Sequence, residues 1–481
     1  MRRTELLKRI FIIVMLWAVV TMGHPDAARG QTRFEHLDKP RVIVLTDITN
    51  EPDDEESMVR FLVYSNEYDV EGMIATTSVW LRDKVRPEKI RECVDAFGQV
   101  RANLLRHAPG YPTVAHLHSV TKSGLAEFGM KGVGLGKSSE GSRHIIDVVD
   151  RSDERPVWIS VWGGANCLAQ ALWDVRNMRS QAELDAFVAK LRVYTISDQD
   201  DSGRWLRITF PKLFYIVTPS TVDYREYYKA TWTGISGDRR YKNGPMHKFE
   251  LVDNPWLRAN VIEGHGPLGA LYPELEYIME GDTPSFLGLI SNGLGSRTSP
   301  AYGGWSGRYV LYQSYAETRP IWTNVEGGLD TVVAENSVTY TSAQATIWRW
   351  REAYQHDFAA RMDWCVADLY GQANHNPVAA FRDDRSKAVA HLTVKAGQTV
   401  SLDGAQSYDP DGDALTCRWF VYPEAGTYQG SVAVESPDNT LGRITVPKNA
   451  KGKTIHVILE VTDDGTPSLR SYRRIILDVA A

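Results

Sequence analysis

Apolar runs typical of strands alternate with helical patterns through the first three quarters of the chain. Four runs rich in β-branched residues are typical of buried parallel strands, and they cover residues 41–46, 69–77, 156–161 and 191–197. A helical pattern follows the first run, at Met58, Phe61, Leu62 and Ser65, and another follows the third, at residues 166–175. This alternation predicts an α/β domain with a mostly parallel sheet. In such sheets the ligand site lies beyond the carboxyl ends of the strands.

The pattern changes near residue 372. Residues 342–369 are predicted to be helical and to close the first domain, and residues 372–377 read as a linker. From residue 379 onward, short alternating runs are separated by turn signals, which is typical of an antiparallel β-sandwich. We therefore expect one domain over residues 31–371 and a second over residues 378–481.

The first 30 residues have the pattern of a secretory signal peptide. Arg2, Arg3, Lys8 and Arg9 precede an apolar run from Ile10 to Val20, and Ala28-Arg29-Gly30 is a small-x-small cleavage pattern. The run is short for a membrane-spanning helix, which needs about 20 apolar residues. Cleavage after Gly30 and a periplasmic or extracellular location are predicted. An uncleaved anchor is the alternative, and we expect no other contact with a membrane.

Composition narrows the class of protein. With 43% hydrophobic and 24% charged residues, the chain is too apolar to be disordered. Its net charge is −6, and removal of the signal segment, which carries a net +3, leaves −9. An acidic chain is a poor partner for nucleic acid, so we expect none. The four cysteines are too few for a disulfide scaffold, and buried free thiols are favoured, although one disulfide stays open.

A loop after the first predicted strand concentrates carboxylates. Asp47, Glu51, Asp53 and Asp54 fall within eight positions, just before a helix. Four carboxylates this close repel one another unless positive charge lies among them. A hard cation such as Ca²⁺, which takes six to eight oxygen ligands, would supply it. A helix N-terminus also favours negative charge, so solvated helix capping remains the alternative to a metal site.

This segment resembles the N-terminal signature of the nucleoside hydrolase superfamily. In that signature an Asp ends the first strand, an Asp-Asp pair opens the helix, and an E-G-I-T-T-like strand follows. Here these elements are Asp47, Asp53-Asp54 and residues 71–77, with spacing two residues longer than the compact signature. Residues 163–166 resemble the family's G-P-x-T-N turn, and residues 281–284 resemble its late H-D-P element.

A closer resemblance is to an exported bacterial subfamily that is described as cellulose-binding with a nucleoside-hydrolase-like domain. The blocks TDITNEPDDEES, ISDQDDSG, EGDTPSFL and GGWSGRY all look like that subfamily. The C-terminal segment looks like its sandwich domain, which implies an immunoglobulin-like fold. The resemblance covers nearly the whole chain after residue 30.

The resemblance implies a set of roles. Asp47, Asp54 and Asp282 would bind Ca²⁺, together with a backbone carbonyl of Ala165 or a neighbour. Asp47 would also be the general base, taking a proton from a metal-held water that attacks the anomeric carbon. Asp53 would hold a sugar hydroxyl.

One departure concerns the leaving group. Many nucleoside hydrolases carry a His that protonates the leaving base at the position of Gly281. A glycine cannot be a general acid. Another group then serves, the leaving group needs no proton, or the activity is lost. His265 is a possible substitute, although a lone histidine is more often structural.

Further residues have both a binding and a structural interpretation. Asp198 and Asp201, at the end of the 191–197 strand, are candidates for sugar binding, with a helix-capping turn as the alternative. Asn166 would contact ligand or order its turn. Trp305 could stack on a sugar, but core packing is favoured; Arg308 and Tyr309 are undecided. The turn around Asp409, Asp411 and Asp413 resembles one that sometimes binds Ca²⁺, and a structural turn is favoured.

Three functions remain open from the sequence. The first is an exported Ca²⁺-dependent hydrolase of a nucleoside or another small glycoside. The second is a carbohydrate-binding protein, for cellulose or another plant polysaccharide, that holds sugar without cleaving it. A calcium-stabilised scaffold protein of the envelope ranks last. The intact carboxylates favour the first function, and Gly281 favours the second.

Overall fold

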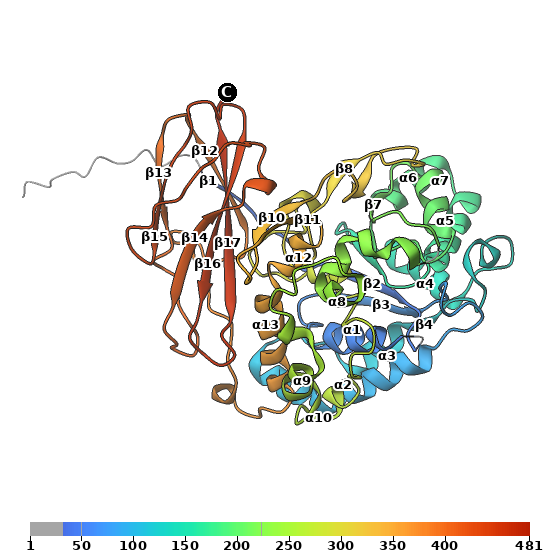
Figure 1. The fold of residues 1–481 in the computed structure, drawn as a ribbon. Coiled ribbons are helices and arrows are strands. Elements are labelled where there is room, and N and C mark those ends of the chain that lie inside the picture. Colours follow the sequence, from blue (N-terminus) through green and yellow to red (C-terminus); the bar gives the residue numbers. More distant parts are fainter. Residues whose placement is uncertain (1–31, 50, 223) are drawn as a thin grey trace, which may run out of the picture.

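The computed structural model describes residues 32–49, 51–222 and 224–481. The predicted signal segment and its cleavage position lie outside these residues. Among the described helices, none is both long and apolar enough to cross a membrane. Figure 1 shows a rounded α/β body beside an elongated β-domain formed by the C-terminal part of the chain.

The α/β body is built on a sheet that contains eight strands within the described residues. Their order is β4-β3-β2-β5-β6-β7-β9-β8, and every pairing is parallel except that of β8 with β9. The prediction of a mostly parallel sheet is confirmed. The strands are β2 (Arg41–Thr46), β3 (Asp69–Ala75), β4 (Thr121–Ser123), β5 (Val157–Val161), β6 (Leu191–Thr195), β7 (Phe214–Ile216), β8 (Val310–Tyr312) and β9 (Ile321–Thr323).

Alternate residues of the central strands pack on opposite faces of this sheet. Val42 and Val44 of β2 join the apolar cluster that includes α1, α2 and α13, whereas Ile43 and Leu45 join the cluster of α4 to α7. Because side chains alternate along a strand, a continuous apolar run is what a strand with helices on both faces requires. The longer helices are α1 (Pro52–Val63), α2 (Pro87–His107), α3 (Val114–Val120), α4 (Glu140–Val149), α5 (Asn166–Met178), α6 (Gln181–Ala189), α7 (Ser202–Thr209) and α13 (Arg351–Trp364).

Short helices occupy the connections after β7. Where one long helix was expected over residues 342–369, the structure has α12 and then α13. The remaining short helices are α8 (Asp238–Tyr241), α9 (Asn254–Leu257), α10 (Gly266–Gly269), α11 (Pro284–Leu287) and α12 (Ala345–Trp348). A small hairpin also lies here, formed by β10 (Asp330–Val333) and β11 (Thr339–Ser342).

The C-terminal domain consists of short, mostly antiparallel strands around its own apolar core. A five-stranded sheet has the order β1-β12-β17-β16-β14, and β13 pairs with β15. The pairing of β12 with β17 is parallel, which the antiparallel prediction did not anticipate. Trp419 packs in this core, as expected. The strands are β12 (Val389–Val394), β13 (Thr399–Asp403), β14 (Thr416–Val421), β15 (Leu441–Thr445), β16 (Thr454–Thr462) and β17 (Arg470–Val479).

The first described strand, β1 (Thr32–Glu35), belongs to the C-terminal sheet. It pairs antiparallel with β12, although residues 31–371 were expected to form the first domain. A short edge strand carries little pattern of its own, so only the partner reveals where it pairs. The predicted domain boundaries otherwise stay a prediction.

The two domains share an apolar interface. Tyr422, Ile458 and Tyr472 of the β-domain belong to the same buried cluster as Trp305 and Trp350. The backbone N–H of Tyr472 donates to the carbonyl oxygen of Asn292 over 3.0 Å. In the linker, the ring of His375 stacks on Trp364 and Tyr370. The β-domain is therefore packed on the α/β body and is not merely tethered to it.

All four cysteines are free thiols. Cys93, Cys167 and Cys365 are buried and Cys417 is half-buried. Burial raises the pKa of Cys93 to about 12, so this thiol stays protonated and unreactive. The favoured interpretation of these residues as free thiols is confirmed.

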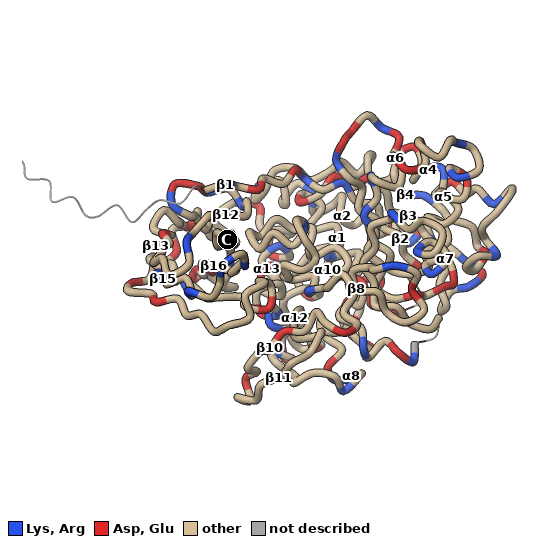
Figure 2. Tube along the Cα trace, turned by 90° about the horizontal axis from the view of Figure 1, so that it is seen from above, with Lys and Arg blue, Asp and Glu red and all other residues tan. Residues whose placement is uncertain are grey.

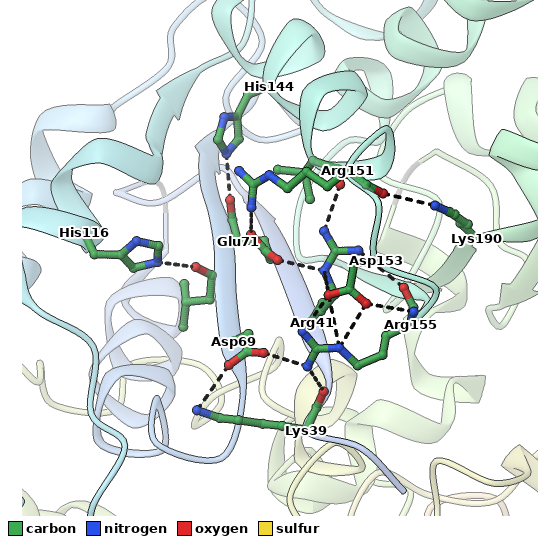
Figure 3. Close-up of polar contacts among 12 residues, drawn as sticks. Lys39, Arg41, Asp69, Glu71, His116, His144, Arg151, Asp153, Arg155 and Lys190 are labelled. Carbon is green, nitrogen blue, oxygen red and sulfur yellow. Dashed lines mark hydrogen bonds and ion pairs between the residues drawn. The ribbon is translucent and has the colours of Figure 1, made fainter.

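At the amino ends of the parallel strands, charged residues form ion pairs with one another. Figure 2 shows Lys and Arg interspersed with Asp and Glu along the whole trace. At the amino ends of β2 and β3, Arg41 donates to Glu71 over 2.7 Å and to the carbonyl oxygen of Val148 over 2.8 Å. Arg155 joins Asp69 and Asp153, each over 2.7 Å (Figure 3). This network joins two strands and the segment before β5 at the edge opposite the carboxyl ends.

Substitution of Arg41 by Met should lower the free energy of unfolding by about 3 kcal/mol, because it removes the buried guanidinium partner of Glu71 and leaves only the exposed Arg151 to pair with this carboxylate. Denaturant unfolding followed by circular dichroism measures this. Arg86→Met is the control, since its ion pair with Glu88 is exposed and contributes about 0–1 kcal/mol. Equal losses in both variants would show that the network does not stabilise the sheet.

Candidate functional site

A cavity of about 700 Å³ opens at the carboxyl ends of the parallel strands. Asp47 enters it from the end of β2, Asp53 and Asp54 from the first turn of α1, and Asp282 from the loop before α11. Ligands of open α/β sheets bind at this edge. The complete lining is Asp47, Glu51, Pro52, Asp53, Asp54, Trp80, Ile196, Gln199, Arg225, Tyr227, Tyr228, Trp232, Arg240, Tyr241, Tyr277, Ile278 and Asp282.

The acidic residues of the cavity are buried. Asp47, Asp54 and Asp282 are 3%, 4% and 4% exposed. The hydroxyl of Thr46 donates to Asp54 Oδ1 over 2.6 Å, whereas Asp282 Oδ2 is buried without a hydrogen-bond partner. Among the described residues, no Lys, Arg or His pairs with these three carboxylates within 4 Å. Buried carboxylates without a cation are costly, and they are most often found at functional sites.

Burial and mutual repulsion raise the pKa values of the whole group. The pKa of Asp54 lies well above its usual range because of burial first and then of repulsion by Asp47 and Asp282. Burial, together with the charge of Asp47, raises the pKa of Asp53 to about 7. Burial and the charges of Asp53 and Asp47 raise that of Glu51 to about 8, although the Arg240 guanidinium opposes this shift. The cavity therefore favours any positive charge that enters it.

The donor atoms suit a hard cation, but they do not form a closed cage. Carboxylate oxygens are the ligands that Ca²⁺ prefers. Asp282 Oδ2, which has no hydrogen-bond partner, is available as such a ligand. Within the described ranges, no three His, Cys, Asp or Glu side chains are placed so that all could hold one ion. A Ca²⁺ ion would thus need additional oxygens, from the backbone, water or a sugar, or a small movement of these carboxylates.

Helix α1 also holds the turn that carries Asp282. Asp53 Oδ2 accepts a hydrogen bond from the backbone N–H of Gly281 over 3.1 Å, and Glu56 Oε2 accepts one from that of Glu280 over 2.8 Å. The hydroxyl of Thr283 donates to that of Ser57 over 3.1 Å. Residues 53, 56 and 57 lie on one face of the helix. One helix therefore supplies Asp54 and positions Asp282.

The structure gives a steric reason for Gly281. A Cβ atom at this position would lie 2.6 Å from Asp53 Oδ2 and 2.8 Å from Ile278 Cδ1. Real Cβ atoms essentially never approach so closely, so no side chain fits here without a shift. Asp53 and Ile278 thus occupy the space that a side chain at position 281, such as the His of many nucleoside hydrolases, would need.

The turn at residues 163–166 lies against the acidic group, as its resemblance implied. A Cβ atom at Gly163 would lie 2.3 Å from Asp47 Oδ1, and one at Gly164 would lie 2.4 Å from Asp200 Oδ2. The carbonyl oxygen of Ala165 accepts the N–H of Ala169 over 3.0 Å in the first turn of α5. The Gly163 backbone thus lies directly beside Asp47.

Three expected sugar-binding residues do not line the cavity. Asn166 donates to Thr77 Oγ1 and to the carbonyl oxygen of Glu127. Asp198 is buried in a two-pronged ion pair with Arg207, with distances of 2.8 and 2.9 Å. Asp201 Oδ1 accepts the backbone N–H of Met130 over 2.7 Å. Each side chain thus has a partner within the protein, and Gln199 of the same segment as Asp198 and Asp201 lines the cavity.

Other residues singled out from the sequence lie elsewhere. His265 Nε2 lies 3.2 Å from Asp363 Oδ1, at the start of α10 and outside the lining of the cavity. Trp305 is buried in the core, Arg308 pairs with Asp330, and Tyr309 contacts Tyr194.

The acidic turn of the β-domain is held by its own backbone. Asp409 Oδ1 accepts the N–H groups of Asp411, Gly412 and Asp413 over 2.8, 3.0 and 3.2 Å. The Asp411 carboxylate accepts a hydrogen bond from the backbone N–H of His375. These contacts are those of a structural turn.

Aromatic residues line the cavity opposite the carboxylates and form a wall that no sequence motif predicted. Trp232 packs edge-on against Tyr227 and Tyr241, with ring centroids 5.5 and 6.1 Å apart. Trp80 packs against the same cluster. Tyr227, Trp232 and Tyr241 lie on consecutive short helices, whereas Trp80 lies far from them in the sequence, on the loop after β3. A cavity with buried carboxylates on one side and aromatic rings on the other suits a ligand that has both hydroxyl groups and an apolar face.

Comparison with known proteins agrees with this geometry. The model of the family "Cellulose-binding Sde182, nucleoside hydrolase-like domain" matches residues 41–309. The chain belongs to this family. The C-terminal domain of cellulose-binding protein Sde0182 matches residues 399–479. The resemblance inferred from the sequence is confirmed.

A solved structure that resembles this chain over nearly its whole length supports the fold. It is a nucleoside hydrolase-related hypothetical protein from Saccharophagus degradans, associated with carbohydrate metabolism. It shares 40% identity at a TM-score of 0.79, over 92% of this chain and 100% of its own. The effector protein XOO4466 matches at 12% identity and a TM-score of 0.30, over 69% of this chain and 95% of its own, and a likeness this low does not show a common fold. No curated protein matches the chain.

Gly281→Ala should lower the free energy of unfolding by about 1–3 kcal/mol, because the new Cβ overlaps Asp53 and Ile278. Gly371→Ala is the matched control, since a Cβ atom there meets no atom within 4 Å. Denaturant unfolding of both variants measures the difference. A Gly281→Ala variant as stable as the control would contradict the steric account of this family member's missing His.

Without a bound cation, stability should fall as the pH rises from about 5 to about 8. The raised pKa values of Asp53 and Glu51 mean that the folded state binds more protons than the unfolded state in this range. Thermal unfolding in chelator across this range measures the trend, and the double variant Asp53→Asn with Glu51→Gln should flatten it. A stability that rises with pH in chelator would show that these carboxylates do not repel in the fold.

Proposed function

We propose that this family member is an exported Ca²⁺-dependent hydrolase that cleaves the glycosyl bond of a small glycoside or N-riboside. The observation that carries the proposal is the group of buried carboxylates beside an aromatic wall at the carboxyl edge of the sheet. A structural role does not require three carboxylates with no ion-pair partner, since each lowers stability. Export rests on the N-terminal pattern and on the cellulose-binding description of the family.

Asp47, Asp54 and Asp282 would hold the ion, with a backbone carbonyl of the turn that follows β5 as a further donor. Ca²⁺, when bound, supplies a site for a water and for sugar hydroxyls, and it relieves the repulsion among the carboxylates. Ala165 and Gly163 are both candidates for that ligand: the carbonyl oxygen of Ala165 accepts one helical hydrogen bond and keeps a second lone pair, and the backbone of Gly163 lies beside Asp47.

The side chains then have distinct tasks. Asp47 accepts the proton of the attacking water, and Asp53 accepts a hydrogen bond from a sugar hydroxyl while it holds the turn of Asp282. The remaining negative charge stabilises the positive charge that develops on the sugar ring as the glycosyl bond breaks. Trp232 and Tyr227, both buried, exclude water from the other side.

The leaving group receives no proton from position 281. Burial raises the pKa values of the neighbouring Tyr227 and Tyr241 hydroxyls, so both are weak acids. With no good proton donor at position 281 or in these hydroxyls, the site favours leaving groups that need little protonation. Glu51, whose pKa burial raises to about 8, is the lining group left to donate a proton. Activated glycosides such as p-nitrophenyl furanosides should be better substrates than nucleosides.

The second candidate function is carbohydrate binding without cleavage. The absence of an acid at Gly281 and the printed description of the family as cellulose-binding favour it. It requires the same cavity to hold a sugar, with the carboxylates as hydrogen-bond acceptors.

Turnover separates the two functions. The mature protein is incubated with p-nitrophenyl furanosides, nucleosides and plant oligosaccharides, in Ca²⁺ and then in chelator. We expect chelator-sensitive release of sugar, with a loss of at least about a hundredfold in Asp47→Asn and in Asp54→Asn. Asp201→Asn is the control, because this carboxylate lies outside the cavity. Cellulose binding without any turnover, unchanged in Asp47→Asn, would leave only the binding function.

A further inference from the structure

The aromatic residues of the cavity change from buried to exposed toward its mouth. Trp232 and Tyr227 are 3% and 5% exposed, and they face the acidic group. Tyr228 and Tyr277, which line the same cavity, are 47% and 48% exposed. Aromatic surface thus lines both the buried and the exposed part of the cavity.

The size of the cavity agrees with a longer ligand. A volume of about 700 Å³ falls among pockets of roughly 300–1,000 Å³ that enclose drug-sized molecules. A single sugar held at the carboxylates would leave the outer part of the cavity to water. A second ring would cover the apolar faces there.

Both outer tyrosines are held in place by neighbouring groups. The Arg240 guanidinium lies 5.2 Å from the centroid of the Tyr277 ring, and the Lys229 ammonium lies 5.7 Å from that of Tyr228. The carbonyl oxygen of Tyr228 also accepts from Asn243 over 2.8 Å and from Gln344 over 3.1 Å. The backbone of Tyr228 is thus anchored, and each ring has a cation beside one part of its surface while about half of the residue stays exposed.

We propose that Tyr228 and Tyr277 form a second sugar subsite at the mouth of the cavity, so that the ligand is the end of an oligosaccharide. The terminal sugar lies at the carboxylates, as the proposed function requires, and the adjoining sugar stacks on the two tyrosines. Aromatic faces match the apolar C–H faces of sugar rings. A nucleoside would place its base on the inner wall and leave these tyrosines uncovered.

The test measures affinity against chain length by calorimetry in Ca²⁺. The probes are glucose, cellobiose, cellotriose and cellotetraose, with inosine and uridine for comparison. The full mature protein is used, in the wild type and in an Asp47→Asn background where the proposed turnover is removed. From one sugar to two, the dissociation constant should fall roughly tenfold, the size of one good aromatic contact. Tyr228→Ala and Tyr277→Ala should each remove most of this gain.

Two further variants control for the nature of the contact. Tyr277→Phe keeps the ring and should keep the gain. Tyr315→Ala removes a tyrosine that is 100% exposed and does not line the cavity, so it should change nothing.

The subsite is overturned if affinity does not rise with chain length, if the rise survives both alanine variants, or if no sugar binds. Tight nucleoside binding that is independent of both tyrosines also overturns it. Failure of the proposed reaction gives a different result. If affinity depends on the two tyrosines but no sugar is released, the subsite is supported and the proposed hydrolase activity is rejected. Turnover of p-nitrophenyl glycosides without dependence on chain length keeps catalysis and removes the subsite.

Discussion

The repulsion among buried carboxylates is the constraint on which the candidate site depends. Asp47, Asp54 and Asp282 are nearly inaccessible to solvent, and in the described part of the chain no cation pairs with them. Neutral donors and the positive end of α1 hold them instead. Burial raises the pKa values of all three carboxylates, and repulsion by neighbouring carboxylates adds to the rise at Asp54 and Asp282. The site therefore favours a bound cation or the hydroxyl groups of a sugar.

The opposite edge of the sheet shows how the same fold treats charges that have only a structural task. There Arg41 lies against Glu71, and Arg155 lies against Asp69 and Asp153. Every carboxylate of that network has a guanidinium partner, and the strands begin at fixed positions. Because the amino ends of the strands are held rigidly, the loops at their carboxyl ends keep the unpaired carboxylates in fixed positions.

Packing links the acidic group to the rest of the molecule. Helix α1 carries Asp54, holds the turn of Asp282, and contributes Arg60, whose guanidinium stacks 3.9 Å from the ring centroid of Phe358 in α13. Helix α13 in turn faces the β-domain, where Arg470 pairs with Glu352. The β-domain thus supports the helix layer behind the site, although it supplies no residue to the cavity lining.

The sequence by itself determined the local elements and the acidic loop. The continuous apolar runs of β2 and β5 require a sheet that is covered on both faces, and the carboxylates after β2 must lie at its carboxyl edge. It could not show that Asp198 pairs with Arg207, or that Asn166 donates to Thr77 and to the carbonyl oxygen of Glu127, because either residue type also binds sugars. Only the tertiary structure brought Trp80, Trp232 and Tyr277 to one wall, since they lie on separate loops without any shared periodicity. It alone explained Gly281, whose missing side chain is a matter of the space left by Asp53 and Ile278.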